Sequence, residues 1–90
     1  MKYYDWNEEK NQWLKKERNI SFEIIVNCLE QEKILDKISH PNSEKYPNQF
    51  IFIVEYENYA YLVPFVEDEE KVFLKTIIPS RKATEKYIRR

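Results

Sequence analysis

The spacing of apolar residues changes after residue 31, and this change most constrains the fold of the chain. Before it, apolar residues recur at i, i+3, i+4 and i+7, the pattern of a helix packed on a core. These residues are Phe22, Ile25, Val26 and Leu29, and Ser21 precedes them as a suitable N-cap. After it, β-branched and aromatic residues alternate with a period of two, which indicates strands.

An earlier helix is predicted in the segment "YYDWNEEKNQWLKKERN", after a short strand or lead-in. Asp5 and Glu8 have the spacing of a capping box. Asn19 can adopt the left-handed conformation that commonly ends a helix. The face expected to meet the core holds Trp6, Trp13 and Leu14.

The rest of the chain is predicted to form strands over residues 33–39, 50–57, 59–67 and 72–79. Asn58 joins the second and third as a hairpin, and the acidic turn 68–71 joins the third and fourth. Pro64 has no N–H to donate, so it marks an edge or a bulge. Pro79 ends the last strand, and Ser80 can cap a final helix.

The expected architecture is a single α+β domain over residues 1–90. Two N-terminal helices pack on an antiparallel β-meander of about four strands, a short C-terminal helix follows, and the helices are expected on one face of the sheet. A chain of this length buries about 60% of its unfolded surface, which is enough for one core.

The composition excludes several classes of protein. Because the chain has no glycine, Asn or Asp must fill its left-handed turns, and a glycine-rich phosphate loop is excluded. A single cysteine excludes an internal disulfide framework and favours a reducing cytoplasm. No apolar run approaches the ~20 residues of a membrane span, and the first ten residues lack the apolar segment of a secretion signal. We therefore expect a cytoplasmic protein that needs no membrane.

The charge is unevenly distributed, although the net charge is only −1. Residues 80–90 carry five basic residues against Glu85, a balance of +4, whereas residues 1–79 have a balance of −5. The basic tail is therefore the candidate contact for a polyanion. The alternative is a solvated terminal helix in which Arg81 pairs with Glu85 at i, i+4.

Few residues offer catalytic or metal chemistry. One histidine and one cysteine do not form a ligand cluster, and the acidic residues 67–70 are expected to be solvated, so we expect neither a metal nor a cofactor. Cys28 lies beside the apolar stripe, where a small buried core residue is expected rather than a nucleophile. His40 is the only side chain of a type that titrates near neutral pH, but a histidine in a loop can equally be polar surface.

Arg81 follows a strand end and opens a helix, where its guanidinium and free backbone N–H groups can point at one phosphate. Lys10 on the first helix and Lys75 on the last strand could surround an RNA backbone together with Arg81. Tyr87 could stack on a base or pack on the sheet, and packing is the stronger expectation.

Two segments resemble the BrnT-type toxins of bacterial toxin–antitoxin pairs. The first is "YDWNEEKNQWLKKERNISFE", with a Trp6-Asn7 step, Lys10 four residues on, and the family's hydrophobic-Ser-Phe-Glu start at 20–23. The second is "IIPSRKATEKY", which is similar to the family's Ile-Ile-Ser-Ala-Arg-x-Ala-Thr segment and has Arg81 in place.

The resemblance implies a compact RelE-like fold and a ribonuclease that stops translation. It also implies a small cognate antitoxin, often with a ribbon-helix-helix part, so that DNA is contacted only through the antitoxin complex. In metal-independent cleavage Arg81 would hold the phosphate, Lys10 would be a second positive group, and His40 would be the acid or base. The expected RNA-binding residues are Lys75, Lys82, Lys86 and Tyr87.

A second interpretation comes from a departure in the middle of the chain. The family's Thr-x-Arg step after the third strand is replaced by "VPFVEDEE", which has no arginine. A non-catalytic toxin or attenuated homologue would act by binding its antitoxin or a protein target, as ParE-like relatives act on DNA gyrase. The absent arginine and the acidic turn favour binding, whereas the basic tail and Lys10 favour the ribonuclease.

Overall fold

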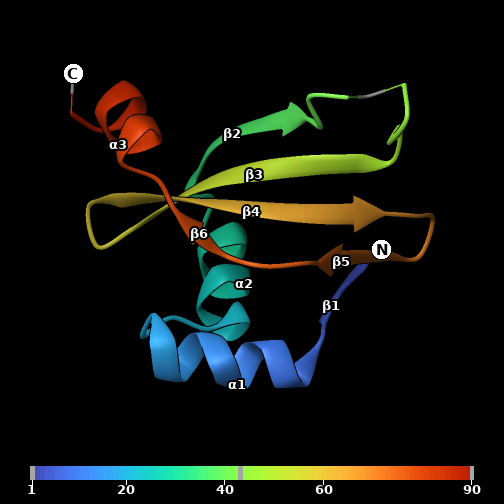
Figure 1. Ribbon diagram of the computed structural model, residues 1–90, viewed down its shortest axis with the longest axis horizontal. Helices are drawn as coiled ribbons and strands as arrows, with labels where there is room; N and C mark the ends of the chain where they lie inside the picture. Colours follow the sequence, from blue (N-terminus) through green and yellow to red (C-terminus); the bar gives the residue numbers. More distant parts are fainter. Residues whose placement is uncertain (1, 43, 90) are drawn as a thin grey trace.

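The structure, a computed structural model, describes residues 2–42 and 44–89 and has an α+β fold, as predicted (Figure 1). Its elements are β1 (Tyr3–Trp6), α1 (Glu8–Glu17), α2 (Phe22–Glu30), β2 (Ile34–Ser39), β3 (Gln49–Tyr56), β4 (Tyr59–Glu67), β5 (Lys71–Leu74), β6 (Ile78–Pro79) and α3 (Arg81–Tyr87). Within the described residues, no helix has the length and apolar character needed to cross a membrane.

The strands form one mixed sheet in the order β1-β5-β4-β3-β2, with β6 also paired to β4. The antiparallel run from β2 to β5 confirms the predicted meander. The expectation of a purely antiparallel sheet is wrong, because β1 pairs in parallel with β5, from Tyr3 opposite Lys71 to Trp6 opposite Leu74. This pairing brings Tyr4 and Trp6 against the core and covers the outer edge of β5.

The predicted last strand is interrupted between β5 and β6, opposite Pro64. The carbonyl of Pro64 accepts a hydrogen bond from the Lys75 backbone N–H at 2.8 Å, but proline has no N–H to return. Pro64 lies in β4, an interior strand, and its pairing with Ile51 of β3 has no register shift, so neither predicted place, an edge or a bulge, is observed. The position where Pro64 lacks an N–H lies opposite the gap between β5 and β6. In this gap Ile77 turns inward and is fully buried.

Local hydrogen bonds explain where the helices begin. Ser21 and Ser80 are N-caps as predicted, and their hydroxyls accept from the backbone N–H groups of Ile24 and Ala83. The N-cap of α1 is Asn7, so the predicted start at Asp5 is wrong. Asp5 belongs to β1, and strand pairing therefore delays the helix until after Trp6.

Within residues 2–42 and 44–89, four non-glycine residues have positive φ angles. Asn19 and Asn58 confirm the expectation for a chain without glycine, whereas Glu32 and Glu57 contradict the rule that only Asn or Asp fills such positions. Glu57 and Asn58 form the two-residue turn between β3 and β4, and the twist of a hairpin favours positive φ at both positions. Hairpin geometry therefore prevails here over the residue preference.

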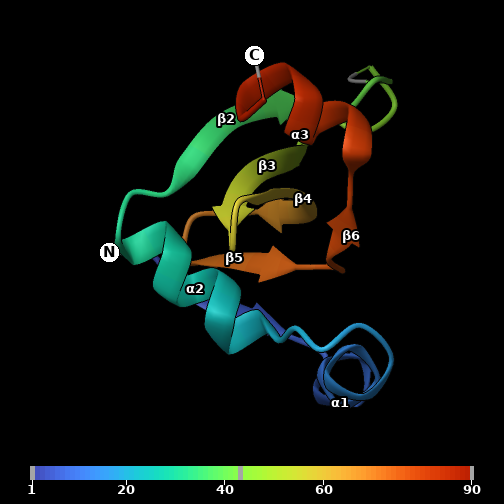
Figure 2. The same ribbon diagram turned by 90° about the vertical axis from the view of Figure 1, so that its left-hand side faces the viewer.

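The sheet separates two apolar clusters, because side chains alternate between its faces. The larger contains Val54 and packs on α1 and α2, and the smaller contains Ile53 and packs on α3 through Ala83. Figure 2 shows α2 and α3 on opposite sides of the sheet. The expectation that the helices share one face is therefore wrong for α3.

Some of the residues predicted to pack in the core from α1 and α2 do so in the structure, and others do not. Leu14 and Cys28 are buried as expected. Trp6 lies in β1 rather than in the helix and stacks on Phe22, with ring centroids 5.7 Å apart. Trp13 is 43% exposed, so its predicted core position is wrong.

Candidate functional site

The C-terminal helix α3 is fixed to the sheet by its buried side. Thr84 Oγ1 accepts a hydrogen bond from the Ala60 backbone N–H at 2.8 Å and donates to the Ser80 carbonyl at 2.7 Å. Ala83 and Thr84 are both buried against the sheet. The remaining faces of α3 therefore carry Arg81, Lys82 and Lys86 into solvent.

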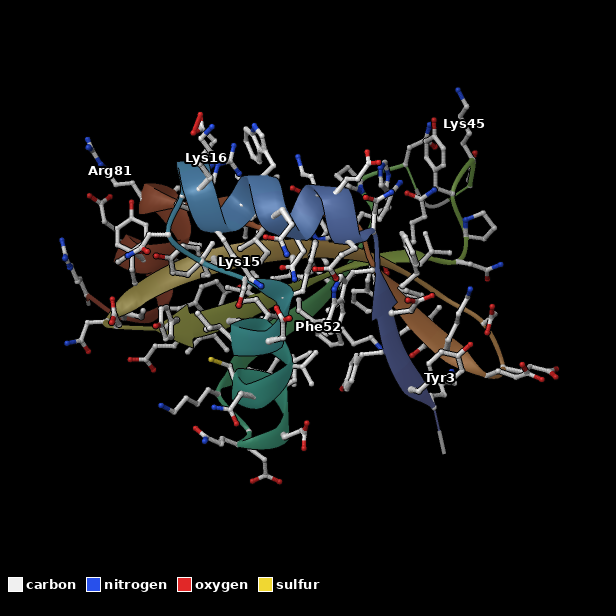
Figure 3. The ribbon with its side chains drawn as sticks, turned by 90° about the horizontal axis from the view of Figure 1, so that it is seen from below. Tyr3, Lys15, Lys16, Lys45, Phe52 and Arg81 are labelled. Carbon is white, nitrogen blue, oxygen red and sulfur yellow. The ribbon has the colours of Figure 1, made fainter. Side chains whose placement is uncertain are left out.

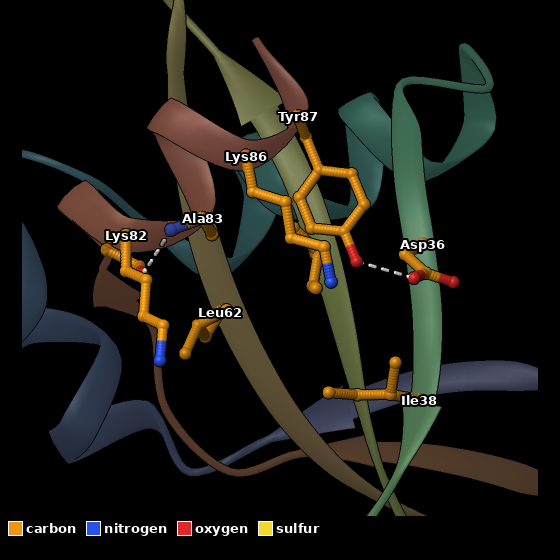
Figure 4. Close-up of a pocket in the computed structure, with 9 residues that line it drawn as sticks. Asp36, Ile38, Leu62, Lys82, Ala83, Lys86 and Tyr87 are labelled. Atoms are coloured by element: carbon orange, nitrogen blue, oxygen red, sulfur yellow. Dashed lines mark hydrogen bonds between the residues drawn. The ribbon is translucent and has the colours of Figure 1, made fainter. Parts of the chain in front are cut away.

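An open groove of about 280 Å³ lies between α3 and β2 (Figure 4). Ile38, Ile53, Leu62 and Ala83 supply its apolar surface. The polar groups around it come from Asp36, Ser80, Lys82, Lys86 and Tyr87. The groove is thus an apolar hollow with two ammonium groups from α3 and one carboxylate from β2.

Asp36 and Tyr87 connect the two sides of this groove. The Tyr87 hydroxyl donates to Asp36 Oδ2 at 2.7 Å, across 51 residues of sequence. This bond lowers the pKa of Asp36, with further help from the Lys37 backbone N–H, and it raises the pKa of Tyr87. Tyr87 also packs on the cluster beneath α3, which confirms packing as its stronger expectation.

The basic side chains of α3 form no ion pair within 4.0 Å with any described carboxylate, although Lys86 helps to lower the pKa of Asp36. Among the described residues, the ion pairs within 4.0 Å are Lys2–Glu67, Lys15–Glu23, Lys37–Glu67 and Lys71–Asp5. The alternative pairing of Arg81 with Glu85 therefore does not form. Arg81 lies outside the groove lining, and its side chain extends into solvent (Figure 3).

Lys75 and His40 both contact Gln49, the first residue of β3. Lys75 Nζ lies 3.5 Å from the side-chain oxygen of Gln49, and the backbone N–H of His40 donates to the Gln49 carbonyl at 3.0 Å. His40 comes directly after β2, two residues beyond Ile38, and does not line the groove. The loop after β2 that carries His40 lies at the opposite end of the sheet from α3 (Figure 1), so the structure does not bring His40 to Arg81.

The His40 ring has a defined hydrogen-bonding state. Nδ1 accepts the Asn42 backbone N–H at 3.0 Å, so in the neutral ring the proton is on Nε2. The Tyr46 ring covers the imidazole, with centroids 4.6 Å apart. In this tautomer Nε2 donates a hydrogen bond and cannot accept a proton. For Nε2 to become an acceptor, the ring proton must move to Nδ1, and this breaks the contact with Asn42.

Lys10 is not brought to the other predicted site residues. Its ammonium lies 4.3 Å from the centroid of the Trp13 ring, and the Arg18 guanidinium lies 5.0 Å from the same centroid. In both views α1 and α3 are at opposite ends of the molecule (Figures 1 and 2). The predicted cation pair of Lys10 and Arg81 is therefore divided between two separate surfaces.

The acidic turn and the cysteine have structural roles. Asp68 Oδ1 accepts the backbone N–H groups of Lys71 and Glu70, and these bonds lower the pKa of Asp68. Burial raises the pKa of the Cys28 thiol, which opposes formation of a nucleophilic thiolate. In residues 2–42 and 44–89, no group of three or more His, Cys, Asp or Glu side chains is arranged to hold a metal.

The sequence interpretation did not identify Asp36, Ile38 or Leu62 as site residues. A lone carboxylate alternating with apolar residues in "ILDKIS" is a signal that could have pointed to Asp36. Tyr87 is among the predicted site residues, but its pairing with Asp36 could not be found from the sequence, because only the packing of α3 brings Tyr87 to β2.

No family model matches the chain, and no curated protein and no solved structure is significantly similar to it.

Proposed function

We propose that the protein is a BrnT-type toxin with a RelE-like arrangement, which binds RNA on the α3 side of its sheet and cleaves it without a metal. The single observation that carries this proposal is the set of cations on that side that lack a carboxylate partner among the described residues. Its members are Lys75, Arg81, Lys82 and Lys86. Unpaired cations gathered on one side of a protein of net charge −1 support a polyanionic partner.

The chemistry proposed is attack of a ribose 2′-oxygen on the adjacent phosphorus, with departure of the 5′-oxygen. Arg81 holds the phosphate and stabilises the charge that develops on its oxygens. His40 is assigned the proton transfers from the 2′-oxygen and to the 5′-oxygen. These require release of its Nδ1 contact with Asn42 and its approach to the phosphate held by Arg81, because α3 and the loop after β2 lie at opposite ends of the sheet (Figure 1). Lys10 contributes from α1 only as a contact to a more distant part of the RNA.

The proposal includes a partner. A small antitoxin, with a ribbon-helix-helix part that binds DNA, neutralises the toxin by covering Arg81 and the basic tail with an acidic segment. Contact with DNA then occurs only through the antitoxin.

A non-catalytic toxin or attenuated homologue is the second candidate, and two features of the site favour it. Lys10 lies away from Arg81, and the His40 ring is already engaged by Asn42. Such a protein binds its antitoxin or a protein target through the α3 side without cleaving RNA.

The test is incubation of the purified protein with total RNA, with and without EDTA. We expect fragments with 5′-hydroxyl ends in both conditions, since the mechanism uses no metal. Arg81→Ala should reduce the cleavage rate by about 10²-fold or more, the usual effect of removing one group that stabilises the transition state.

Lys33→Ala is the matched control, because Lys33 is an exposed cation outside the α3 surface and its removal changes the net charge equally. It should leave the cleavage rate unchanged. Intact RNA together with growth arrest in cells would support the binding toxin, and equal cleavage by the two variants would refute the role of Arg81.

A further inference from the structure

We propose that the groove between α3 and β2 binds one guanine base of the RNA, and that Asp36 is the residue that selects guanine. This inference rests on the proposed action on RNA and names the base recognised at that site.

The groove suits a single flat, largely apolar ring system. Its volume of about 280 Å³ is at the lower limit of the ~300–1,000 Å³ typical of small-molecule sites. Ile38, Ile53 and Leu62 line it, and Tyr87 stands beside Asp36 at one rim (Figure 4). Unstacked bases of single-stranded RNA are commonly held in this way, between apolar or aromatic side chains.

The Asp36 carboxylate can accept further hydrogen bonds at the rim. Oδ2 already accepts from Tyr87 at 2.7 Å, and Oδ1 accepts from the Lys37 backbone N–H at 2.8 Å. A carboxylate has about four acceptor positions, so each oxygen retains one. The two existing bonds hold the carboxylate in one orientation.

A carboxylate held in this way distinguishes among the four bases. Guanine presents two adjacent donors on its Watson–Crick edge, N1–H and the N2 amino group, and both can bond to one carboxylate. Adenine, cytosine and uracil each place an acceptor beside their donor on that edge, and the acceptor would face Asp36. A site whose oriented polar groups pair with one ligand binds less tightly the analogues that leave those groups unpaired.

The charges around the groove favour RNA over an acidic peptide. Lys82 and Lys86 reach the groove from α3 and can contact the phosphates that flank the base. The Lys86 ammonium lies beside the Tyr87 hydroxyl and helps to lower the pKa of Asp36 (Figure 4). Asp36 is the only carboxylate among the residues that line the groove. It repels an acidic side chain placed there but accepts the neutral donor edge of guanine.

The experiment measures binding of short fluorescent oligouridylates that contain one central G, A or C, or only U. Their 2′-O-methyl riboses lack the attacking hydroxyl, so cleavage cannot occur. Dissociation constants are measured by fluorescence anisotropy at one fixed salt concentration, because affinity for phosphates depends on salt. We expect the G oligonucleotide to bind about tenfold more tightly than the others, the usual scale for one bidentate base contact.

Asp36→Asn should abolish this preference, because one acceptor oxygen becomes a donor while the side-chain shape is kept. Glu85→Gln is the matched control: it removes one negative charge from α3 outside the groove and should keep the preference for G. Circular dichroism verifies that both variants are folded.

The outcomes separate this inference from the proposed function. Absence of binding to every oligonucleotide would overturn both, whereas equal binding to all four would overturn only the guanine site. Retention of the preference in Asp36→Asn would exclude Asp36 as the selecting residue. Displacement of the G oligonucleotide by a glutamate-rich peptide that binds more tightly would show that the groove has a different occupant.

Discussion

At the scale of single residues, Asp36 and Tyr87 are the pair on which the candidate site depends. One hydrogen bond between them joins the edge strand β2 to the terminal helix α3. The bond favours the charged form of Asp36 and the neutral form of Tyr87, as their pKa shifts indicate. The pair therefore stabilises the fold only where both forms exist, between acidic and strongly alkaline pH.

We expect Tyr87→Phe to lower the free energy of unfolding at neutral pH but not in acid. Because the folded-state pKa of Asp36 is lowered, its contribution is present above about pH 4 and is lost as the pH falls through the folded value. Because the folded-state pKa of Tyr87 is raised, its contribution is present below about pH 10 and is lost above the folded value.

The difference in the free energy of unfolding between wild type and Tyr87→Phe is measured by urea unfolding across the pH range. Tyr3→Phe is the control, because Tyr3 is more than half exposed and its hydroxyl makes no hydrogen bond within the described residues. A stability difference between wild type and Tyr87→Phe that persists unchanged below pH 3 would rule out the pair as its source.

At the scale of elements, the end of α2 shows how the lack of glycine leads to backbone strain. The Lys33 N–H bonds to the Cys28 carbonyl and the Glu32 N–H to the Leu29 carbonyl, the bonds of a Schellman motif. The motif requires positive φ at Glu32, where φ is 58°. A residue with a Cβ is strained in this conformation, and glycine is not.

Glu32→Gly should therefore stabilise the protein by about 1 kcal/mol, raising the melting temperature by roughly 4–8 °C. Glu30→Gly is the matched control, because the same replacement within the helix should destabilise it. Thermal unfolding followed by circular dichroism measures both. A lower melting temperature for Glu32→Gly would contradict the strain assigned to this position.

Elements whose signals are local could be predicted from the sequence. α2, its Ser21 cap and the β3–β4 hairpin follow from periodicity and turn residues close together in the chain. The pairing of β1 with β5 could not be predicted, because it joins segments separated by most of the chain. The interruption between β5 and β6 opposite Pro64 could not be predicted either, because it depends on which strand lies beside β4.

At the scale of the whole molecule, the sheet determines which predicted site residues can act together. Arg81, Lys82, Lys86 and Tyr87 belong to one helix. Lys75 and His40 both contact Gln49, and the loop that carries His40 lies at the opposite end of the sheet from α3 (Figure 1). Lys10 instead belongs to a separate surface on α1, with Trp13 and Arg18. Neither grouping could be derived from the spacing of residues along the chain, because each depends on how the helices pack on the sheet.

The molecule thus has two basic regions that could contact RNA, and the central claim is that the α3 side is the binding site. The most direct test is chemical-shift mapping of the ¹⁵N-labelled protein with a 2′-O-methyl RNA. We expect the largest changes at Ile38, Leu62, Lys82 and Lys86, with little change at Lys10 and Trp13. Changes concentrated at Trp13 and its neighbours on α1, with the α3 groove unaffected, would contradict the claim.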